Sequence, residues 1–153
     1  MFKDSTTGLD RILQEAGPVD IDSYLETHAE SLADPERPFA AYMRRMFKEK
    51  KVSQQDVFRR AYIPEQYGYR LIGQTRNTVR RDYILRFCFA GRFNLKETQR
   101  ALKLYGMSEL YSRIPRDAVL MIALNRGISD IDRVNELLAA HDMEPLMECK
   151  HEE

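Results

Sequence analysis

Paired arginines are the residues of this chain with the clearest capacity for chemistry. Arg-Arg pairs occur at residues 44–45, 59–60 and 80–81. Each guanidinium group can donate several hydrogen bonds to a phosphate and neutralise its charge. The pairs fall on three helices expected in one unit, which favours a shared surface for a polyanion. The alternative is that they are ordinary solvated helix faces, as exposed charges usually are.

The distribution of charge along the chain points to the same region. Residues 38–103 hold 16 Lys and Arg against 5 Asp and Glu, a net charge of +11. Residues 1–37 hold 3 against 9, and residues 104–153 hold 5 against 10, so both ends are acidic. A basic centre between acidic ends suggests a polyanion-binding surface in the middle. The alternative is that the acidic ends fold back and neutralise the centre for a purely structural reason.

Recognisable catalytic and metal-binding motifs are missing from the sequence. It has no glycine-rich phosphate loop, no G-x-S-x-G elbow and no H-E-x-x-H pair. His141, Cys149 and His151 are close in sequence, but their spacing fits no zinc pattern, and the tail at 148–153 is expected to fray. His28 on an apolar helix face is expected to be a packed or partly exposed histidine. The sequence therefore predicts a protein that is not an enzyme and has no cofactor and no metal site.

The composition is that of a globular chain. Its 153 residues are 43% hydrophobic and 31% charged, which suits a protein with a core and excludes a disordered one. The longest apolar run, residues 118–124, is far shorter than the roughly 20 residues of a membrane span. The N-terminus lacks an apolar signal region, which predicts a cytoplasmic protein without a membrane segment. Cys88 lies in an apolar stretch and is expected to be a buried thiol.

Apolar spacing predicts an all-α fold. Apolar residues recur three and four positions apart, and no stretch alternates as a half-buried strand does. An acidic N-terminal arm, residues 1–37, should contain helices over 7–16 and 20–32. A Gly-Pro break separates these two helices, and a proline-containing linker at 33–38 ends the arm.

The centre of the chain, residues 38–110, predicts a bundle of about five short helices. Ser53 is a good N-cap, and Asn94 with Glu97 three residues later is typical of a capping box. Gly73 is a plausible helix stop. The helices are expected over residues 39–49, 53–61, 65–72, 79–90 and 95–105.

The C-terminal hairpin expected over residues 111–147 repeats part of the centre. Residues 81–87 match residues 116–122, and both segments begin with Arg-Asp. Later apolar positions also match and end in Met-x-x-Leu in both places. Residues 79–110 and 115–146 are therefore interpreted as two stacked copies of one helical hairpin. Chance similarity between amphipathic helices is the alternative.

Two short helices in the centre, at 53–61 and 65–72, carry the functional argument. They are joined by a short turn, and a third helix is expected to pack across them, which is the arrangement of a helix-turn-helix unit. Ile63 in the turn should close the core between them. The other residues expected to face inward are Val57, Ala61, Leu71 and Ile72.

A family resemblance rests on this unit. Residues 52–57 read VSQQDV, and they are followed by Ile63 in the turn and by the loop pair Arg76-Asn77. This pattern resembles the lambda-repressor-like (Cro/cI, XRE-type) helix-turn-helix family over roughly residues 38–106, less than half of the chain. With its extra C-terminal hairpin, the chain also looks like a group of longer bacterial proteins of this type.

The resemblance implies a mode of binding to double-stranded DNA. Residues 53–61 would cross the backbone, and residues 65–72 would lie in the major groove. Gln can pair with adenine, Arg with guanine, and Glu can accept from cytosine. The implied base-contacting residues are Glu65, Gln66, Tyr69 and Arg70. The implied phosphate-contacting residues are Gln54, Arg59, Arg60, Arg76, Asn77, Arg80 and Arg81.

Several residues depart from the family pattern. Tyr62 replaces the turn glycine, and Thr78 replaces the loop proline. Phe58 replaces a small alanine and should spread the helix pair or pack elsewhere. Glu65 would repel phosphate, and Gly68 weakens a helix by about 1 kcal/mol relative to Ala.

Two functions from different classes follow. The leading prediction is a sequence-specific DNA-binding protein, a transcription regulator that could form a homodimer through its N-terminal arm or its C-terminal hairpin. The alternative is a protein–protein interaction adaptor that kept the fold and lost DNA reading, with an acidic protein partner on the basic centre. In a further version of the first prediction, the helix expected over 20–32 covers the basic surface and inhibits it.

Overall fold

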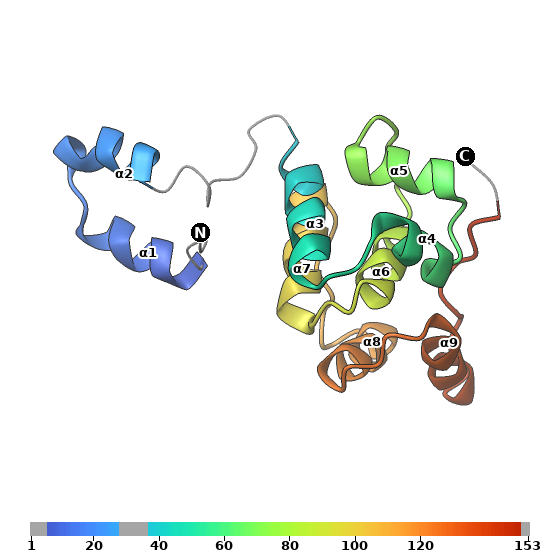
Figure 1. Ribbon diagram of the computed structural model, residues 1–153. Helices are drawn as coiled ribbons and strands as arrows, with labels where there is room; N and C mark the ends of the chain where they lie inside the picture. The colour runs from blue at the N-terminus through green and yellow to red at the C-terminus, as the bar shows by residue number, and fades with distance from the viewer. Residues whose placement is uncertain (1–5, 28–36, 151–153) are drawn as a thin grey trace. The chain divides into compact units, whose positions relative to one another are not determined.

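The computed structural model of the chain describes residues 6–27 and 37–150, and these residues form an all-α structure without strands (Figure 1). The predicted fold class is thereby confirmed. The chain divides into two compact units, Met1–Pro35 and Glu36–Glu153. The helices are α1 (Thr6–Glu15), α2 (Ile21–Thr27), α3 (Pro38–Glu49), α4 (Gln54–Ala61), α5 (Glu65–Gly73), α6 (Arg81–Ala90), α7 (Leu95–Tyr105), α8 (Pro115–Asn125) and α9 (Ile131–Ala140).

The first unit contains two short helices, α1 and α2. The expected break after α1 is present, and a single 3-10 turn, Pro18–Asp20, leads from it into α2. The Asp20 carboxylate accepts a hydrogen bond from the Gly17 N–H at 2.9 Å and closes this turn. Residues 28–32 of the helix predicted over 20–32 lie outside the described residues, as does most of the predicted linker.

The second unit is built around α6. Every residue from Tyr83 to Ala90 is buried, because α4, α7 and α9 pack against this helix. Cys88 is among the buried residues, as predicted, and burial raises the pKa of its thiol. Leu120 of α8 and Leu138 of α9 belong to the same core, so the C-terminal hairpin is part of this unit.

Capping interactions begin and end the helices where the sequence predicts them. The Ser53 hydroxyl accepts a hydrogen bond from the Asp56 N–H at 3.1 Å at the start of α4. Asn94 and Glu97 exchange two hydrogen bonds, of 2.8 and 2.9 Å, at the start of α7. α5 ends at Gly73, near the predicted stop, but Gln74 and not the glycine adopts the left-handed conformation that closes the helix, with φ 58°.

Two reciprocal ion pairs join the two copies of the repeat. The Arg81 guanidinium donates to both carboxylate oxygens of Asp117. The Arg116 guanidinium donates to both carboxylate oxygens of Asp82, at 2.9 and 3.1 Å. Each Arg-Asp pair lies in the first turn of its helix, α6 or α8, so the two ion pairs join the N-terminal ends of these helices.

Backbone contacts at the ends of the two copies also correspond. Asp117 accepts a hydrogen bond from the Tyr111 N–H, and Asp82 accepts one from the Met147 N–H, both at 2.9 Å. The two copies of the sequence repeat therefore make equivalent hydrogen bonds. The same correspondence holds for the Gln99 side chain with the Leu110 N–H and for the Asn135 side chain with the Leu146 N–H.

The C-terminal segment is packed as far as it is described, which differs from the frayed tail expected from residue 148. Cys149 is buried. The Tyr83 hydroxyl donates to the Glu148 carbonyl at 3.4 Å, and Arg86 donates to the Met147 carbonyl at 2.8 Å. These side chains of α6 hold the segment against the core, while residues 151–153 lie outside the described residues.

Candidate nucleic-acid interface

The turn between α4 and α5 begins with a residue in an unusual backbone conformation. Tyr62 has φ 56° and ψ 42°, the left-handed region that favours glycine. Its hydroxyl donates a hydrogen bond to Asp132 on α9 at 2.9 Å, and this bond raises the pKa of Tyr62. Ile63 follows and is buried, as predicted. Tyr62 thus supplies the turn that glycine supplies in the family pattern, and its contact with α9 helps to offset the steric cost.

Phe58 and Gly68 form a matched pair between α4 and α5. The Phe58 side chain is buried, and its ring occupies the space that a side chain at position 68 would need. The ring also meets Tyr69 edge-on, with 4.9 Å between ring centroids, and Phe87 of α6 at 5.6 Å. Phe58 therefore packs against the second helix directly, and the glycine that weakens α5 is the residue that makes room for it.

The substitution Gly68→Ala tests this fit. An added Cβ would lie 2.6 to 2.9 Å from atoms of the Phe58 ring. We therefore expect the free energy of unfolding to fall by about 1–3 kcal/mol, despite the better helix propensity of Ala. Urea denaturation followed by circular dichroism measures this loss.

Gly73→Ala in the same helix is the matched control. The nearest atom to a Cβ at Gly73 is the flexible end of the Arg44 side chain, at 3.1 Å. We expect no loss of stability there, because that side chain can move aside. Equal losses at Gly68 and Gly73 would contradict the proposed fit with Phe58.

The residues predicted to contact bases lie together on the outer face of α5. Glu65, Gln66 and Arg70 are exposed, and Tyr69 is half-exposed because one side of its ring rests on Phe58. The opposite face of α5 is buried, and it includes the predicted inward-facing residues. The helix therefore presents carboxylate, amide, hydroxyl and guanidinium groups on one surface, a set that can read the edges of base pairs.

The residues predicted to contact phosphate on α4 are accessible. Arg59 and Arg60 are exposed in the last turn, and Gln54 is half-exposed at the first residue of the helix. The Arg59 guanidinium donates to the Asp56 carboxylate at 2.9 Å, but both side chains are open to solvent. An exposed ion pair of this kind contributes little to stability, so Arg59 can exchange Asp56 for a phosphate.

The loop between α5 and α6 exposes Arg76, Asn77 and Arg80, and it is longer than predicted because α6 begins two residues later. The Tyr105 hydroxyl of α7 accepts a hydrogen bond from the Thr78 N–H at 2.8 Å and anchors this loop. Burial raises the pKa of Tyr105. A proline, which the family pattern has here, would lack this N–H. The role of Tyr105 was not predicted, because its local sequence pattern resembles that of any core tyrosine.

Arg81 departs from its predicted role as a phosphate contact. Its guanidinium is bound to the carboxylate of Asp117, which is buried. A cation that neutralises a buried carboxylate cannot turn to a phosphate without leaving that carboxylate unpaired. Lys50, another basic residue of the centre, is likewise paired, with Glu97 at 2.8 Å. The available basic surface is therefore smaller than the sequence count suggests.

Similarity to known proteins assigns no function to this surface. No family model, curated protein or solved structure matches the chain. The function has to be inferred from the chemistry of α4, α5 and the loop that follows α5.

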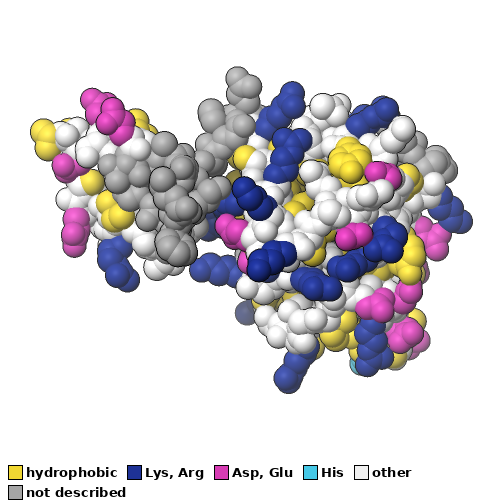
Figure 2. Space-filling model, in the orientation of Figure 1, with side chains coloured by type: hydrophobic (Ala, Val, Ile, Leu, Met, Phe, Trp, Pro, Cys, Tyr) yellow, Lys and Arg dark blue, Asp and Glu magenta, His cyan; other side chains and the backbone are white. Residues whose placement is uncertain are grey.

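The charged side chains of the second unit are unevenly distributed. Figure 2 shows dark-blue Lys and Arg side chains over much of its visible face, with some magenta carboxylates among them and several more toward the lower right. Basic side chains thus outnumber acidic ones over most of this face, in keeping with the net charge of +11 of residues 38–103.

Metal-binding clusters and membrane-spanning helices are absent from the part of the chain that is described. Within residues 6–27 and 37–150, no three His, Cys, Asp or Glu side chains come together as metal ligands could. His151 and His28 lie outside these stretches. Among the described helices, none combines the length and the hydropathy that a membrane span requires.

Proposed function

We propose that the second unit is a sequence-specific double-stranded DNA-binding domain of the lambda-repressor-like type. In this proposal the protein is a transcription regulator acting in the bacterial cytoplasm. α5 enters the major groove, and α4 lies across the DNA backbone. The observation that carries the proposal is the single exposed face of α5, on which Glu65, Gln66, Tyr69 and Arg70 lie side by side.

Basic residues on both sides of α5 support the proposal. Arg59 and Arg60 lie on the helix before it, and Arg76 and Arg80 lie on the loop after it. Contacts to phosphate position a protein on the duplex, while contacts to bases select the sequence. A reading helix with phosphate-binding groups before and after it suits both tasks.

The test begins with the full chain and a random pool of duplexes. Bound duplexes are selected and sequenced, and the affinity for the selected sequence is measured at two salt concentrations. We expect a preferred sequence and an affinity that falls steeply as salt rises, because several phosphates release counterions on binding. The absence of duplex binding even at low salt would contradict the proposal. Co-purification of one protein partner in a stoichiometric amount, unchanged by nuclease treatment, would then favour the adaptor alternative.

Single substitutions distinguish residues that contact bases from residues that contact phosphates. Arg70→Ala should cost about 1–3 kcal/mol of binding free energy on the selected sequence and relax the preference at one position. Arg76→Ala should weaken binding to all sequences about equally. It should also reduce the slope of log K against log salt concentration by about one, since one phosphate contact is lost. Arg133→Ala on α9, another exposed arginine, is the control and should change neither quantity. Equal effects of Arg70→Ala on all sequences would mean that α5 does not read bases.

A further inference from the structure

A hollow of about 410 Å³ opens between several parts of the second unit. Its wall includes Tyr62 of the turn after α4, Arg86 of α6, Asp132 of α9 and Leu146 of the C-terminal segment. α4, α9 and the C-terminal segment lie next to one another in Figure 1. The volume is within the range of small-molecule sites, which is about 300–1,000 Å³.

The Arg86 guanidinium is a buried cation on the wall of this hollow. The residue is 2% exposed and donates to three carbonyl groups, those of Ala61, Leu146 and Met147. A guanidinium has five N–H groups, so two of them, one on each Nη atom, remain without an acceptor. No carboxylate of the described residues forms an ion pair with Arg86, although a buried charge is normally paired. Arg86 therefore has both the charge and the donors to bind an anionic group.

Asn135 adds a donor of fixed orientation to the same wall. Its Oδ1 accepts a hydrogen bond from the Leu146 N–H at 2.9 Å, so its Nδ2 is the atom that is left for a ligand. Within the described part of the chain, nothing accepts a hydrogen bond from this Nδ2. A carboxylate can accept from an amide and a guanidinium at once, because each of its oxygens has two lone pairs.

The Asp132 carboxylate gives the hollow a negative charge. It accepts a hydrogen bond from the Tyr62 hydroxyl at 2.9 Å, but no cation of the described residues pairs with it. Its place in the first turn of α9 favours the ionised form. The other two charged residues of the wall, Glu148 and Lys150, pair with each other at 3.4 Å. The hollow therefore keeps one positive and one negative group, Arg86 and Asp132, that do not pair with each other.

We propose that this hollow binds a free amino acid, with its carboxylate at Arg86 and Asn135 and its ammonium group at Asp132. A ligand with one positive and one negative charge pairs both groups that the protein leaves unpaired. A simple anion would be repelled by Asp132, and a simple amine would be repelled by Arg86, whereas a zwitterion avoids both costs. The exposed Tyr62 ring and the exposed Pro145 also line the hollow and offer an apolar surface to the side chain of the ligand.

The hollow is separate from the surface of α5 that we propose to read DNA. None of the four residues on that surface lines it. The binding of an amino acid therefore does not depend on the proposed function, and either can fail without the other.

Titration of the full chain with each of the twenty amino acids, followed by NMR of the backbone amides, tests the proposal. We expect at least one of them to bind with a Kd below about 1 mM and to shift the signals of Tyr62, Asn135 and Leu146. The N-acetyl and α-amide derivatives of that amino acid each lack one charge, and each should bind at least about tenfold more weakly. No binding by any of the twenty, or equal binding of either derivative, would overturn the proposal.

Substitutions that preserve size and shape test the two ends of the ligand. Asp132→Asn removes the negative charge but keeps an acceptor for the Tyr62 hydroxyl. Asn135→Asp keeps the acceptor for the Leu146 N–H but loses the amide donor and adds a negative charge beside the carboxylate of the ligand. Each should weaken binding at least about tenfold. Glu136→Gln is the matched control, because Glu136 is an exposed carboxylate of α9 that does not line the hollow, and it should leave the affinity unchanged. Binding that survives both other substitutions would contradict the site.

Discussion

Replacing Asp117 with Ala is expected to lower the free energy of unfolding by about 3–5 kcal/mol. The Asp117 side chain is only 1% exposed, and both of its oxygens accept hydrogen bonds from the Arg81 guanidinium. It also accepts the Tyr111 N–H at 2.9 Å. The substitution removes the carboxylate and leaves a partly buried cation and a backbone donor without this partner. Urea denaturation of the full chain, followed by circular dichroism, measures the loss.

An exposed ion pair of the same protein is the control. Asp56 pairs with Arg59 on the surface of α4, and Asp56→Ala should cost no more than about 1 kcal/mol. Adding Arg81→Met to Asp117→Ala should recover part of the loss, since the unpaired cation is then removed. If Asp117→Ala costs no more than Asp56→Ala, the reciprocal pairs do not hold the two copies of the repeat together.

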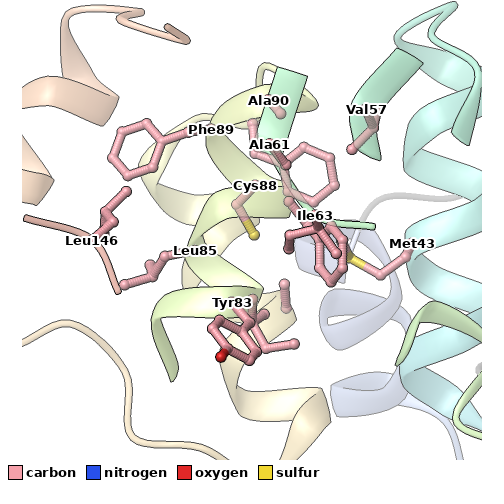
Figure 3. Close-up of a cluster of buried hydrophobic side chains, with 14 of the residues drawn as sticks. Met43, Val57, Ala61, Ile63, Tyr83, Leu85, Cys88, Phe89, Ala90 and Leu146 are labelled. Atoms are coloured by element: carbon pink, nitrogen blue, oxygen red, sulfur yellow. The ribbon is translucent and has the colours of Figure 1, made fainter. Parts of the chain in front are cut away.

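Signals within one helix or turn allowed most of the fold to be predicted. Apolar spacing located the helices, and Asn94 with Glu97 marked the start of α7. The inward-facing residues of the helix-turn-helix unit are buried as expected. Figure 3 shows Val57, Ala61 and Ile63 in one cluster with Met43 of α3 and residues of α6. These predictions succeeded because periodicity and capping depend on neighbours a few residues away.

Contacts between residues far apart in the sequence were missed. Phe58 and Gly68 each read as a departure from the family pattern, and only their contact shows that one accommodates the other. Arg76 and Arg81 lie near the same loop, and the sequence around them does not distinguish them. Only Arg81 pairs with the Asp117 carboxylate, which lies 36 residues further along the chain, so it is not available to phosphate. The repeat itself contained a signal. Both copies begin with Arg-Asp, so the arginine of each copy can pair with the aspartate of the other.

A charged residue inside an apolar run is another signal of a long-range contact. Arg86 lies among buried residues of α6, where its counterpart in the second copy is Met121. Its guanidinium donates to three carbonyl groups, those of Ala61 at 3.0 Å, Leu146 at 2.9 Å and Met147 at 2.8 Å. Ala61 is the last residue of α4, so Arg86 joins the helix-turn-helix unit to the C-terminal segment.

Arg86→Met is therefore expected to lower the free energy of unfolding by about 3 kcal/mol, because it leaves buried carbonyl groups without donors. Burial lowers the pKa of Arg86, and the Asp82 carboxylate opposes this shift. An arginine nevertheless stays charged at neutral pH, so the expected loss does not vary around pH 7. Chemical denaturation at neutral pH measures it.

Arg60→Met makes the same chemical change on the exposed side of α4 and should alter stability by no more than about 0.5 kcal/mol. Arg86→Lys should give an intermediate loss, because an ammonium group retains the charge but lacks the planar fork that reaches three carbonyls. A hollow of about 410 Å³ lined by Arg86, Tyr62 and Leu146 opens beside these groups. If Arg86→Met leaves stability unchanged, water from this hollow satisfies the carbonyl groups. The connection between α4 and the C-terminal segment would then rest on apolar packing, chiefly that of Leu146, and not on the guanidinium.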